Sequence, residues 1–351
     1  MNKYYLIYQD IKEKIVNGAY KTGEKLPSKR VTADAYGVSV ITVENAYSLL
    51  YEEGYIYSKE KKGYFVCPIE VFPQIEHNKK EGVISYLSDD SAIKKGDFEY
   101  SVWFKAVKKV IADGGAKSFT KSPNKGLAVL RNAISDYLFR YRKMVAQPKN
   151  IIIGSGSEQL YESAVKILGR DRIYGIENPC YQMITSVYNG LGVQTTPLKM
   201  AEDGIDSKEL TEKDFSVLHV TPFNSFPSGI TATASKRHEY LSLIKKRSGY
   251  IIEDDFASEF FKPGNPISSL YSLSVDDNVI YINTFSKSLS PSMRMGYMIL
   301  PDELLETYDR VLGEFSCSVP VMEQYALTEF ISSGSFERHL NRMRRKMQKT
   351  K

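Results

Sequence analysis

A single lysine stands among hydroxyl side chains directly after an apolar run, and an arginine follows it seven residues later. In residues 281–298, YINTFSKSLSPSMRMGYM, the lysine is Lys287, its hydroxyl neighbours are Thr284 and Ser286, and the arginine is Arg294. A partly desolvated lysine amine has a lowered pKa and can condense with a carbonyl group, while a guanidinium can bind a phosphate through two hydrogen bonds. Without further elements, the ordinary expectation for Lys287 is a surface charge.

Three acidic residues end a second apolar run, YIIEDDF at residues 250–256. Strand alternation places Glu253 and Asp255 on one face and Asp254 on the other. A carboxylate buried there needs a cationic partner or a metal ion. For any single acid at such a place, a helix cap or a solvated turn is the more common role.

A third run, IIIGSGSE at residues 151–158, passes from a strand to a helix through small residues. Free backbone N–H groups around Gly156 and Ser157 can cradle a phosphate, although the run alone also suits a plain tight turn. Lysine, carboxylate, small-residue turn and arginine together suit pyridoxal phosphate. The amine condenses with its aldehyde, the carboxylate keeps its ring nitrogen protonated, and amides, hydroxyls and arginine bind its phosphate.

These stretches lie in a part of the chain where helical patterns alternate with apolar, strand-like runs. The runs begin near residues 151, 172, 217, 250, 279 and 295. Such alternation predicts a largely parallel α/β sheet with ligand groups at the carboxyl ends of its strands. Upstream, residues 68–82 contain two prolines, several charges and no periodicity, which predicts a linker.

The first 67 residues have a different pattern, that of three short helices and a hairpin. One amphipathic face predicts a helix that ends near residues 17–18, carried by Tyr4, Tyr8, Ile11 and Ile15. Ser28 and Ser39 can cap a second and a third helix, the third with a buried stripe of Val43, Ala46 or Tyr47, and Leu50. The run YIYSKEKKGYFV then predicts a hairpin. The set predicts a winged helix-turn-helix that reads DNA with residues 39–53, and a small helical adaptor is the alternative.

Composition narrows the class of protein. The chain has 351 residues, which favours at least two domains, and a net charge of +5, which permits nucleic-acid binding without arguing for it. Its three cysteines share no metal-ligand spacing, so we expect no metal site and no disulfide framework. No signal peptide or membrane-spanning run is found, which predicts a cytoplasmic protein without membrane contact.

The amino-terminal pattern becomes specific in the run LPSKRVTADAYGVSVITVENAYSLLYEEGYI, which closes with GYFV. It resembles the DNA-binding domain of the GntR family of bacterial repressors over nearly all of residues 1–67. The resemblance implies contacts to an operator from the arginine of the L-P-S-x-R motif, the start of the third helix and the wing. The implied DNA-binding residues are Arg30, Ser39, Thr42, Lys61 and Gly63, with Lys29 and Lys62 adding attraction for phosphates. Two departures are Val40, where members usually carry arginine, and Glu44, an acid on a face turned toward DNA.

Residues 83–345 resemble fold type I aminotransferases. The stretches that carry the likeness are GLAVLRNAISDYLFRYRKMVAQPKNIIIGSGSEQL, ENPCY, TPFNSFPSG, IIEDDFASEF and TFSKSLSPSMRMGYM. The whole chain therefore resembles the MocR subfamily of transcriptional regulators. The resemblance implies a DNA-binding domain at 1–67, a linker at 68–82 and an aminotransferase-like domain at 83–351. It also implies a homodimer that senses pyridoxal phosphate or an amino-acid-like effector.

Carried over by position, the resemblance makes Lys287 the lysine that forms the Schiff base and Asp254 the partner of the ring nitrogen. Tyr181 would stack on the ring and Asn224 would lie beside it, with the phosphate held by Gly156, Ser157, Thr284, Ser286 and Arg294. Two departures affect the ring: Phe256 stands where relatives have tyrosine, and Asn224 and Ser225 replace a His-Gln pair.

The end of the chain is a further departure. In relatives, the helix that matches SFERHLNRMRRKMQ precedes a small domain bearing the arginine that grips a substrate or effector carboxylate, whereas only residues 349–351 follow it here. The resemblance therefore implies a missing carboxyl-terminal lobe and a regulator in place of an efficient enzyme. A working aminotransferase and a cofactor-free dimerisation scaffold with a DNA-binding head remain the alternatives.

Overall fold

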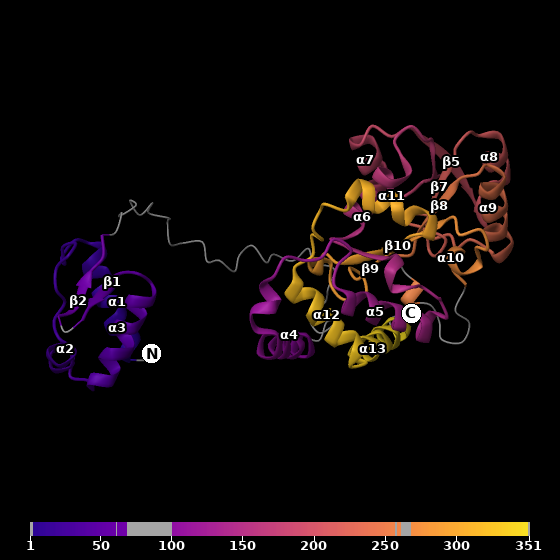
Figure 1. The fold of residues 1–351 in the computed structure, drawn as a ribbon. Helices are drawn as coiled ribbons and strands as arrows, with labels where there is room; N and C mark the ends of the chain where they lie inside the picture. Colours follow the sequence, from indigo (N-terminus) through magenta and orange to yellow (C-terminus); the bar gives the residue numbers. More distant parts are fainter. Residues whose placement is uncertain (1–2, 61, 69–99, 257, 261–267, 350–351) are drawn as a thin grey trace. The chain divides into compact units, whose positions relative to one another are not determined.

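The computed structural model describes residues 3–60, 62–68, 100–256, 258–260 and 268–349 (Figure 1). The chain divides into two compact units, Met1–Asp89 and Asp90–Lys351, each of which is described by itself. Of the predicted linker at 68–82, only Pro68 belongs to the described residues. No helix among the described residues combines the length and the apolar character that crossing a membrane requires.

The smaller unit is the predicted set of three helices and a hairpin. Its elements are α1 (Lys3–Val16), α2 (Lys29–Tyr36), α3 (Val40–Glu52), β1 (Ile56–Lys59) and β2 (Gly63–Val66). The two predicted caps are confirmed, because Ser28 Oγ accepts from Val31 N–H and Ser39 Oγ accepts from Thr42 N–H. β1 and β2 pair antiparallel. The winged helix-turn-helix prediction is therefore confirmed.

One tyrosine ties the second and third helices of this unit together. Tyr47, which is fully buried, donates from its hydroxyl to the carbonyl of Pro27 over 2.9 Å. The same hydroxyl bonds to Thr32 Oγ1 over 2.9 Å. Because a buried hydroxyl is costly without partners, these bonds fix α2 against α3 and so orient the face of α3 that lies opposite the core.

The larger unit is built on one eight-stranded sheet in the order β3-β10-β9-β8-β7-β4-β5-β6. Its strands are β3 (Ile151–Gly154), β4 (Tyr174–Asn178), β5 (Thr195–Ala201), β6 (Gly204–Ile205), β7 (Val217–Val220), β8 (Tyr250–Asp254), β9 (Val279–Thr284) and β10 (Gly296–Ile299). All six predicted strands are present. Five neighbouring strands of the sheet run parallel, in the order β9, β8, β7, β4 and β5. The sheet is mixed, however, because β10 runs antiparallel to both β3 and β9. The sequence patterns did not predict the last two strands of the sheet, β5 and the edge strand β6.

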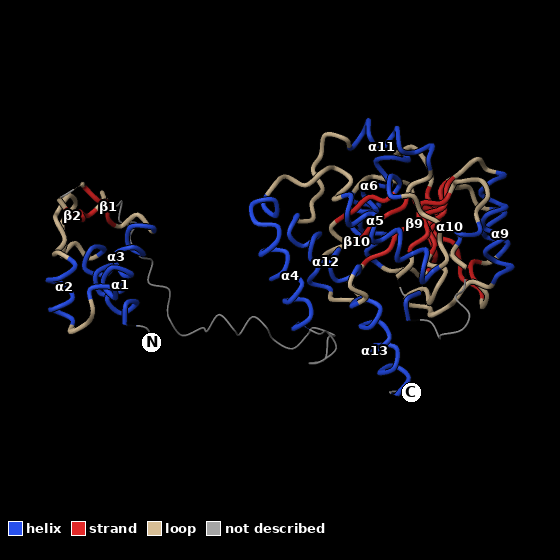
Figure 2. The backbone as a smooth tube through the Cα atoms, turned by 60° about the horizontal axis from the view of Figure 1, so that its bottom comes forward, coloured by secondary structure: helices blue, strands red, loops and turns tan. Residues whose placement is uncertain are grey.

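Helices cover both faces of this sheet (Figure 2). One face packs against α5, α12 and α13, and the opposite face packs against α6, α7 and α11. The α-helices of this unit are α4 (Tyr100–Gly114), α5 (Ala128–Tyr137), α6 (Ser157–Leu168), α7 (Gln182–Gly190), α8 (Ser207–Glu212), α9 (Ala234–Lys246), α10 (Leu270–Leu273), α11 (Leu305–Leu312), α12 (Val321–Ser332) and α13 (Ser335–Lys349). Short helical turns are η2 (Gly115–Phe119), η3 (Leu138–Arg142), η4 (Pro148–Asn150), η5 (Ser258–Phe260), η6 (Pro291–Met293) and η7 (Asp302–Leu304).

A buried ion pair fixes the chain where it leaves β8. Arg142, at the end of η3, donates to Asp255 Oδ2 over 2.9 Å, and its other terminal nitrogen donates to Ser258 Oγ. Asp255 also accepts from Tyr281 on β9 over 2.7 Å. Asp255 is fully buried and the Arg142 side chain is 8% exposed. Since Asp255 follows Asp254 directly, this network holds the end of the acidic run in place.

We predict that Arg142→Met lowers the free energy of unfolding of the larger unit by about 3–5 kcal/mol, because Asp255 becomes a buried charge without its cation. Urea titration followed by tryptophan fluorescence measures this unit alone, since the single tryptophan, Trp103, lies within it.

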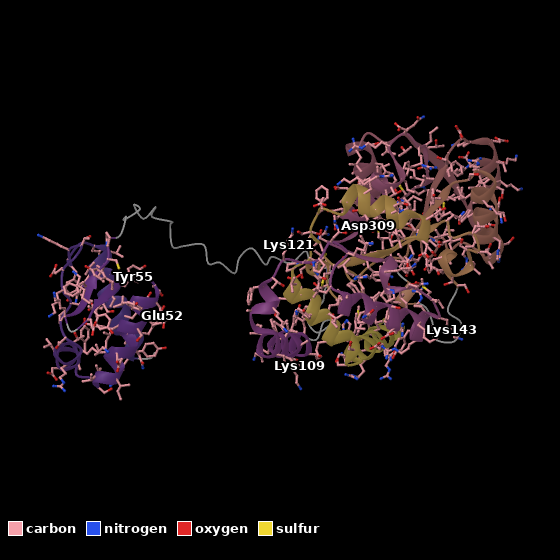
Figure 3. The ribbon with its side chains drawn as sticks, viewed as in Figure 1. Glu52, Tyr55, Lys109, Lys121, Lys143 and Asp309 are labelled. Atoms are coloured by element: carbon pink, nitrogen blue, oxygen red, sulfur yellow. The ribbon has the colours of Figure 1, made fainter. Side chains whose placement is uncertain are left out.

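The matched control is Lys109→Met, at a lysine labelled in Figure 3. This change removes an exposed pair between Lys109 and Glu329 at 2.9 Å. Its unfolding midpoint should stay close to that of the wild type, because water already solvates both charges. Equal midpoints for Arg142→Met and Lys109→Met would show that the buried pair does not have the assigned role.

Candidate cofactor site and nucleic-acid interface

Strand register brings the predicted cofactor residues to one end of the sheet. Gly296, the first residue of β10, pairs with Gly154 at the end of β3 and with Thr284 at the end of β9. On the next strand, Asp254 pairs with Ile282. The small-residue turn after β3, the lysine loop after β9 and the acidic end of β8 are therefore neighbours in space.

The turn after β3 forms a cradle with Arg294. Gly156 precedes α6 with φ +94°, and a Cβ atom added there would lie 3.1 Å from Cζ of Arg294. A side chain would therefore fill the space between the helix start and the guanidinium. Arg294 is half-exposed and donates to Glu158 Oε2 over 3.0 Å. The first N–H groups of α6 have no partner within the helix. Together with the guanidinium of Arg294, they suit a phosphate group.

Lys287 lies beside two aromatic rings. Its Nζ atom is 4.8 Å from the ring centre of Phe256 and 5.5 Å from that of Phe260. Burial lowers the pKa of the Lys287 amine, and the carboxylate of Glu259 opposes that shift. A lowered pKa raises the fraction of neutral amine, which is the form that attacks an aldehyde.

The loop that carries Lys287 is held from both sides. Phe285 N–H donates to the carbonyl of Met295 over 2.9 Å, which closes the loop between β9 and β10. From α13, His339 Nε2 bonds to the carbonyl of Ser288 over 2.9 Å. Phe285 and Leu289 also pack into the core formed with α13. The contacts of Phe285, Ser288 and Leu289 therefore fix the backbone on both sides of Lys287.

Asp254 is buried and accepts a hydrogen bond from a tyrosine. Tyr161 Oη on α6 donates to Asp254 Oδ2 over 2.5 Å. Burial raises the pKa of Asp254 to about 6, while the bond from Tyr161 works in the opposite direction. Asp254 therefore retains an ionised fraction at neutral pH and can pair with a protonated ring nitrogen.

A buried histidine, His219, packs against Tyr161, the tyrosine that bonds to Asp254. The His219 ring is 5.0 Å from the Tyr161 ring, and its Nδ1 atom bonds to Tyr188 Oη over 2.6 Å. Burial lowers the pKa of His219 to about 3, so the imidazole is neutral. Its Nε2 atom has no hydrogen-bond partner among the described residues.

Tyr181 and Asn224 lie on two further loops at strand ends, after β4 and after β7. The loops are joined because Glu177 Oε2 accepts from Ser225 Oγ over 2.5 Å, and the Tyr181 ring meets the Phe226 ring at 6.3 Å. Both residues are exposed. Asn224 has φ +53°. Among the described residues, no hydrogen bond joins Tyr181 or Asn224 to Lys287.

Sequence reasoning missed two of the groups that support this site. Tyr161 lies one helical turn after Ser157, on the face of α6 that packs against the sheet, and helix periodicity could have pointed to it. Glu177 is buried, and its pKa is raised to about 8 by burial. It stands in the quoted ENPCY stretch, but its neighbours Ser225 and Thr221 N–H come from a distant segment.

On the smaller unit, most of the predicted DNA-binding residues are at the surface. Arg30 and Lys62 are exposed, and Gly63 has φ +105°, which favours glycine at this place in the wing. Ser39 and Thr42 bond to each other through their hydroxyls over 2.8 Å at the start of α3. Lys61 lies outside the described residues.

The structure accounts for one departure from the family pattern. Glu44 on α3 accepts from Lys29 Nζ on α2 over 2.5 Å, so its charge is balanced within the unit. Lys29 also lies 5.6 Å from the ring centre of Tyr64 on the wing. The attraction of Lys29 for phosphates is reduced accordingly, since its charge already has a partner.

Among the described residues, no group of three or more histidine, cysteine, aspartate or glutamate side chains could hold a metal ion.

Comparison with known proteins agrees with this division. The model of the family "Bacterial regulatory proteins, gntR family" matches residues 3–66, and that of "Aminotransferase class I and II" matches residues 92–351. The HTH-type transcriptional regulator YdeL of Bacillus subtilis is 32% identical over 97% of this chain and 76% of that relative. The HTH-type pyridoxine biosynthesis transcriptional regulator PdxR of Corynebacterium glutamicum is 29% identical over 96% and 74%. The "Probable rhizopine catabolism regulatory protein MocR" of Rhizobium meliloti is 27% identical over 97% and 73%.

Solved structures support the fold of the larger unit. A kynurenine aminotransferase of Pyrococcus horikoshii has a TM-score of 0.65 at 23% identity, covering 71% of this chain. The α-aminoadipate aminotransferase LysN of Thermus thermophilus has a TM-score of 0.64 at 24% identity, also covering 71% of this chain. The chain spans 64% of the length of each of these two proteins. At this level of identity the likeness shows the fold alone.

Both family models match in sequence order, and the regulators align along almost the whole chain. This chain is therefore a MocR-type member of the GntR family of transcriptional regulators, with a winged helix-turn-helix followed by an aminotransferase-like domain.

Proposed function

We propose that this protein is a transcriptional regulator that binds an operator through its smaller unit and pyridoxal phosphate through its larger unit. The observation that carries the cofactor part is the register at Gly296, which brings the turn at Gly156 and the loop of Lys287 to one end of the sheet. The space between Gly156 and the guanidinium of Arg294 suits a phosphate group. The residues present therefore fit the cofactor.

The residue roles follow from chemistry and position. Lys287 would bind the aldehyde covalently, and Asp254, held by Tyr161, would face the ring nitrogen. The phosphate would be held by the N–H groups of Gly156 and Ser157, by Arg294, and by the hydroxyls of Thr284 and Ser286. Tyr181 would stack on the ring, with Asn224 nearby. When bound, pyridoxal phosphate supplies a reactive aldehyde and a ring that can accept electrons.

A regulatory role is favoured over a role as a working aminotransferase. The relatives that align along the chain are named as transcriptional regulators. Phe256 lies 4.8 Å from Lys287 Nζ and offers no hydroxyl to the cofactor. We further propose a homodimer, because a symmetric pair of heads would read two half-sites of an operator. The sensed molecule is pyridoxal phosphate itself or an amino-acid-like effector that condenses with it.

We predict that the purified protein, incubated with pyridoxal phosphate, gains a visible absorption band that borohydride abolishes, and that Lys287→Ala lacks this band. The reason is that only an amine with a lowered pKa beside a phosphate cradle should capture the aldehyde at low concentration.

Lys208→Ala serves as the matched control, since Lys208 is an exposed lysine of the same unit and its loss should leave the band intact. A band of equal intensity in Lys287→Ala would place the cofactor on other lysines and overturn the assignment. Measurable amino-group transfer to a keto acid by the wild type would instead favour an enzyme.

We predict that Arg30→Ala weakens binding to DNA selected by the wild type from a random pool, by about 1–3 kcal/mol, because a guanidinium contact to base or phosphate is lost. Fluorescence anisotropy with labelled duplexes measures the affinity.

Lys14→Ala is the control, because Lys14 is already paired with Asp10 at 2.7 Å. If the Arg30→Ala and Lys14→Ala variants bind with the same affinity, Arg30 does not contact the operator.

A further inference from the structure

In α3, the third helix of the smaller unit, the face opposite the core is uncharged, which is unusual for a helix that reads DNA. Its buried stripe is Val43, Ala46, Tyr47 and Leu50, and helix spacing places Ile41, Asn45 and Ser48 on the opposite face. All three of these residues are exposed, and Ile41 is 70% exposed. A large apolar side chain with so much exposed surface contributes little to the core of this unit.

This helix carries no cation. Its sequence, VITVENAYSLLYE, contains neither lysine nor arginine. Bidentate recognition of guanine in the major groove uses arginine or lysine, so α3 has no side chain for that contact. The acid on its flank, Glu44, is balanced by Lys29 from α2 and is not free to accept from cytosine without breaking that pair.

The side chains that α3 does present match an A·T base pair. The carboxamide of asparagine can bond twice to adenine, and an apolar side chain can pack on the 5-methyl group of thymine. Among the described residues, no hydrogen bond engages the side chain of Asn45, and the neighbouring Val40 is 41% exposed beside Ile41. The donor, the acceptor and the apolar surface are therefore all available.

We propose that α3 reads A·T base pairs in the major groove, with Asn45 bonding to adenine and Ile41, flanked by Val40, packing on thymine methyl groups. This inference rests on the proposed DNA-binding function and specifies which base pairs the operator presents to α3. Arg30 on α2 and Lys62 on the wing then supply phosphate attraction, while the reading face itself remains uncharged.

The test starts from duplexes that the full-length protein selects from a random-sequence pool. Each thymine in the selected half-site is then replaced by uracil, which removes one methyl group and leaves base pairing unchanged. Affinities are measured by fluorescence anisotropy for the wild type, Ile41→Ala and Asn45→Ala. Leu6→Ala, an exposed apolar position on α1, is the matched control.

We expect A·T pairs at the positions under α3. At one or more of them, uracil should weaken wild-type binding about fourfold, the value of one buried methyl-sized group. Ile41→Ala should lose this sensitivity, whereas Leu6→Ala should keep it. Asn45→Ala should lose preference for one adenine by about fivefold or more.

Selected half-sites with G·C pairs under α3, or wild-type binding that uracil does not change at any position, would overturn the inference while leaving the proposed regulator intact. A protein that selects no sequence from the pool would overturn the proposed function, and this inference with it. Because Ile41 and Asn45 are exposed, their variants should keep the wild-type circular dichroism spectrum, which checks that the unit remains folded.

Discussion

The backbone pairing at Gly296 is the constraint on which the candidate cofactor site depends. This residue lies between β3 and β9 and pairs with both strands. A Cβ atom there would lie 2.8 Å from the carbonyl oxygen of Asn283 and 2.9 Å from Cγ2 of Thr284. Only glycine therefore allows the three strands to meet at this register. The register in turn sets Arg294, two residues earlier, across from Gly156, and sets Lys287 within the loop that closes on Met295.

Three consecutive acids show how the fold accommodates charge beside that site. Glu253 accepts backbone N–H bonds from Leu270 and Tyr271, each over 2.8 Å. Asp254 accepts from Tyr161, and Asp255 is paired with Arg142. A buried carboxylate with backbone donors or a cation is already satisfied, whereas one with a single tyrosine donor keeps capacity for another partner. Among the three, Asp254 is therefore the acid suited to a protonated ring nitrogen.

Local patterns predicted much of this arrangement, and long-range contacts account for what they missed. The caps Ser28 and Ser39, the stripe of α3 and the alternation at 253–255 were predictable, because each depends on residues close in sequence. The antiparallel direction of β10 was not, since strand direction depends on neighbours far along the chain. Tyr161 is 93 residues from Asp254 and Arg142 is 113 residues from Asp255, so neither pairing had a local pattern. The Lys29 and Glu44 pair likewise needed the packing of α2 on α3, which turned an apparent conflict with DNA binding into a balanced charge.

In the proposed regulator, cofactor occupancy of the larger unit alters DNA binding by the smaller unit. The most direct measurement of this link is the affinity for a selected operator as a function of pyridoxal phosphate concentration. Wild type and Lys287→Ala would be titrated side by side by fluorescence anisotropy, each with and without saturating cofactor. We predict that the cofactor changes the dissociation constant of the wild type severalfold, in either direction, and leaves that of Lys287→Ala unchanged. The same dissociation constant for the wild type with and without cofactor would contradict it.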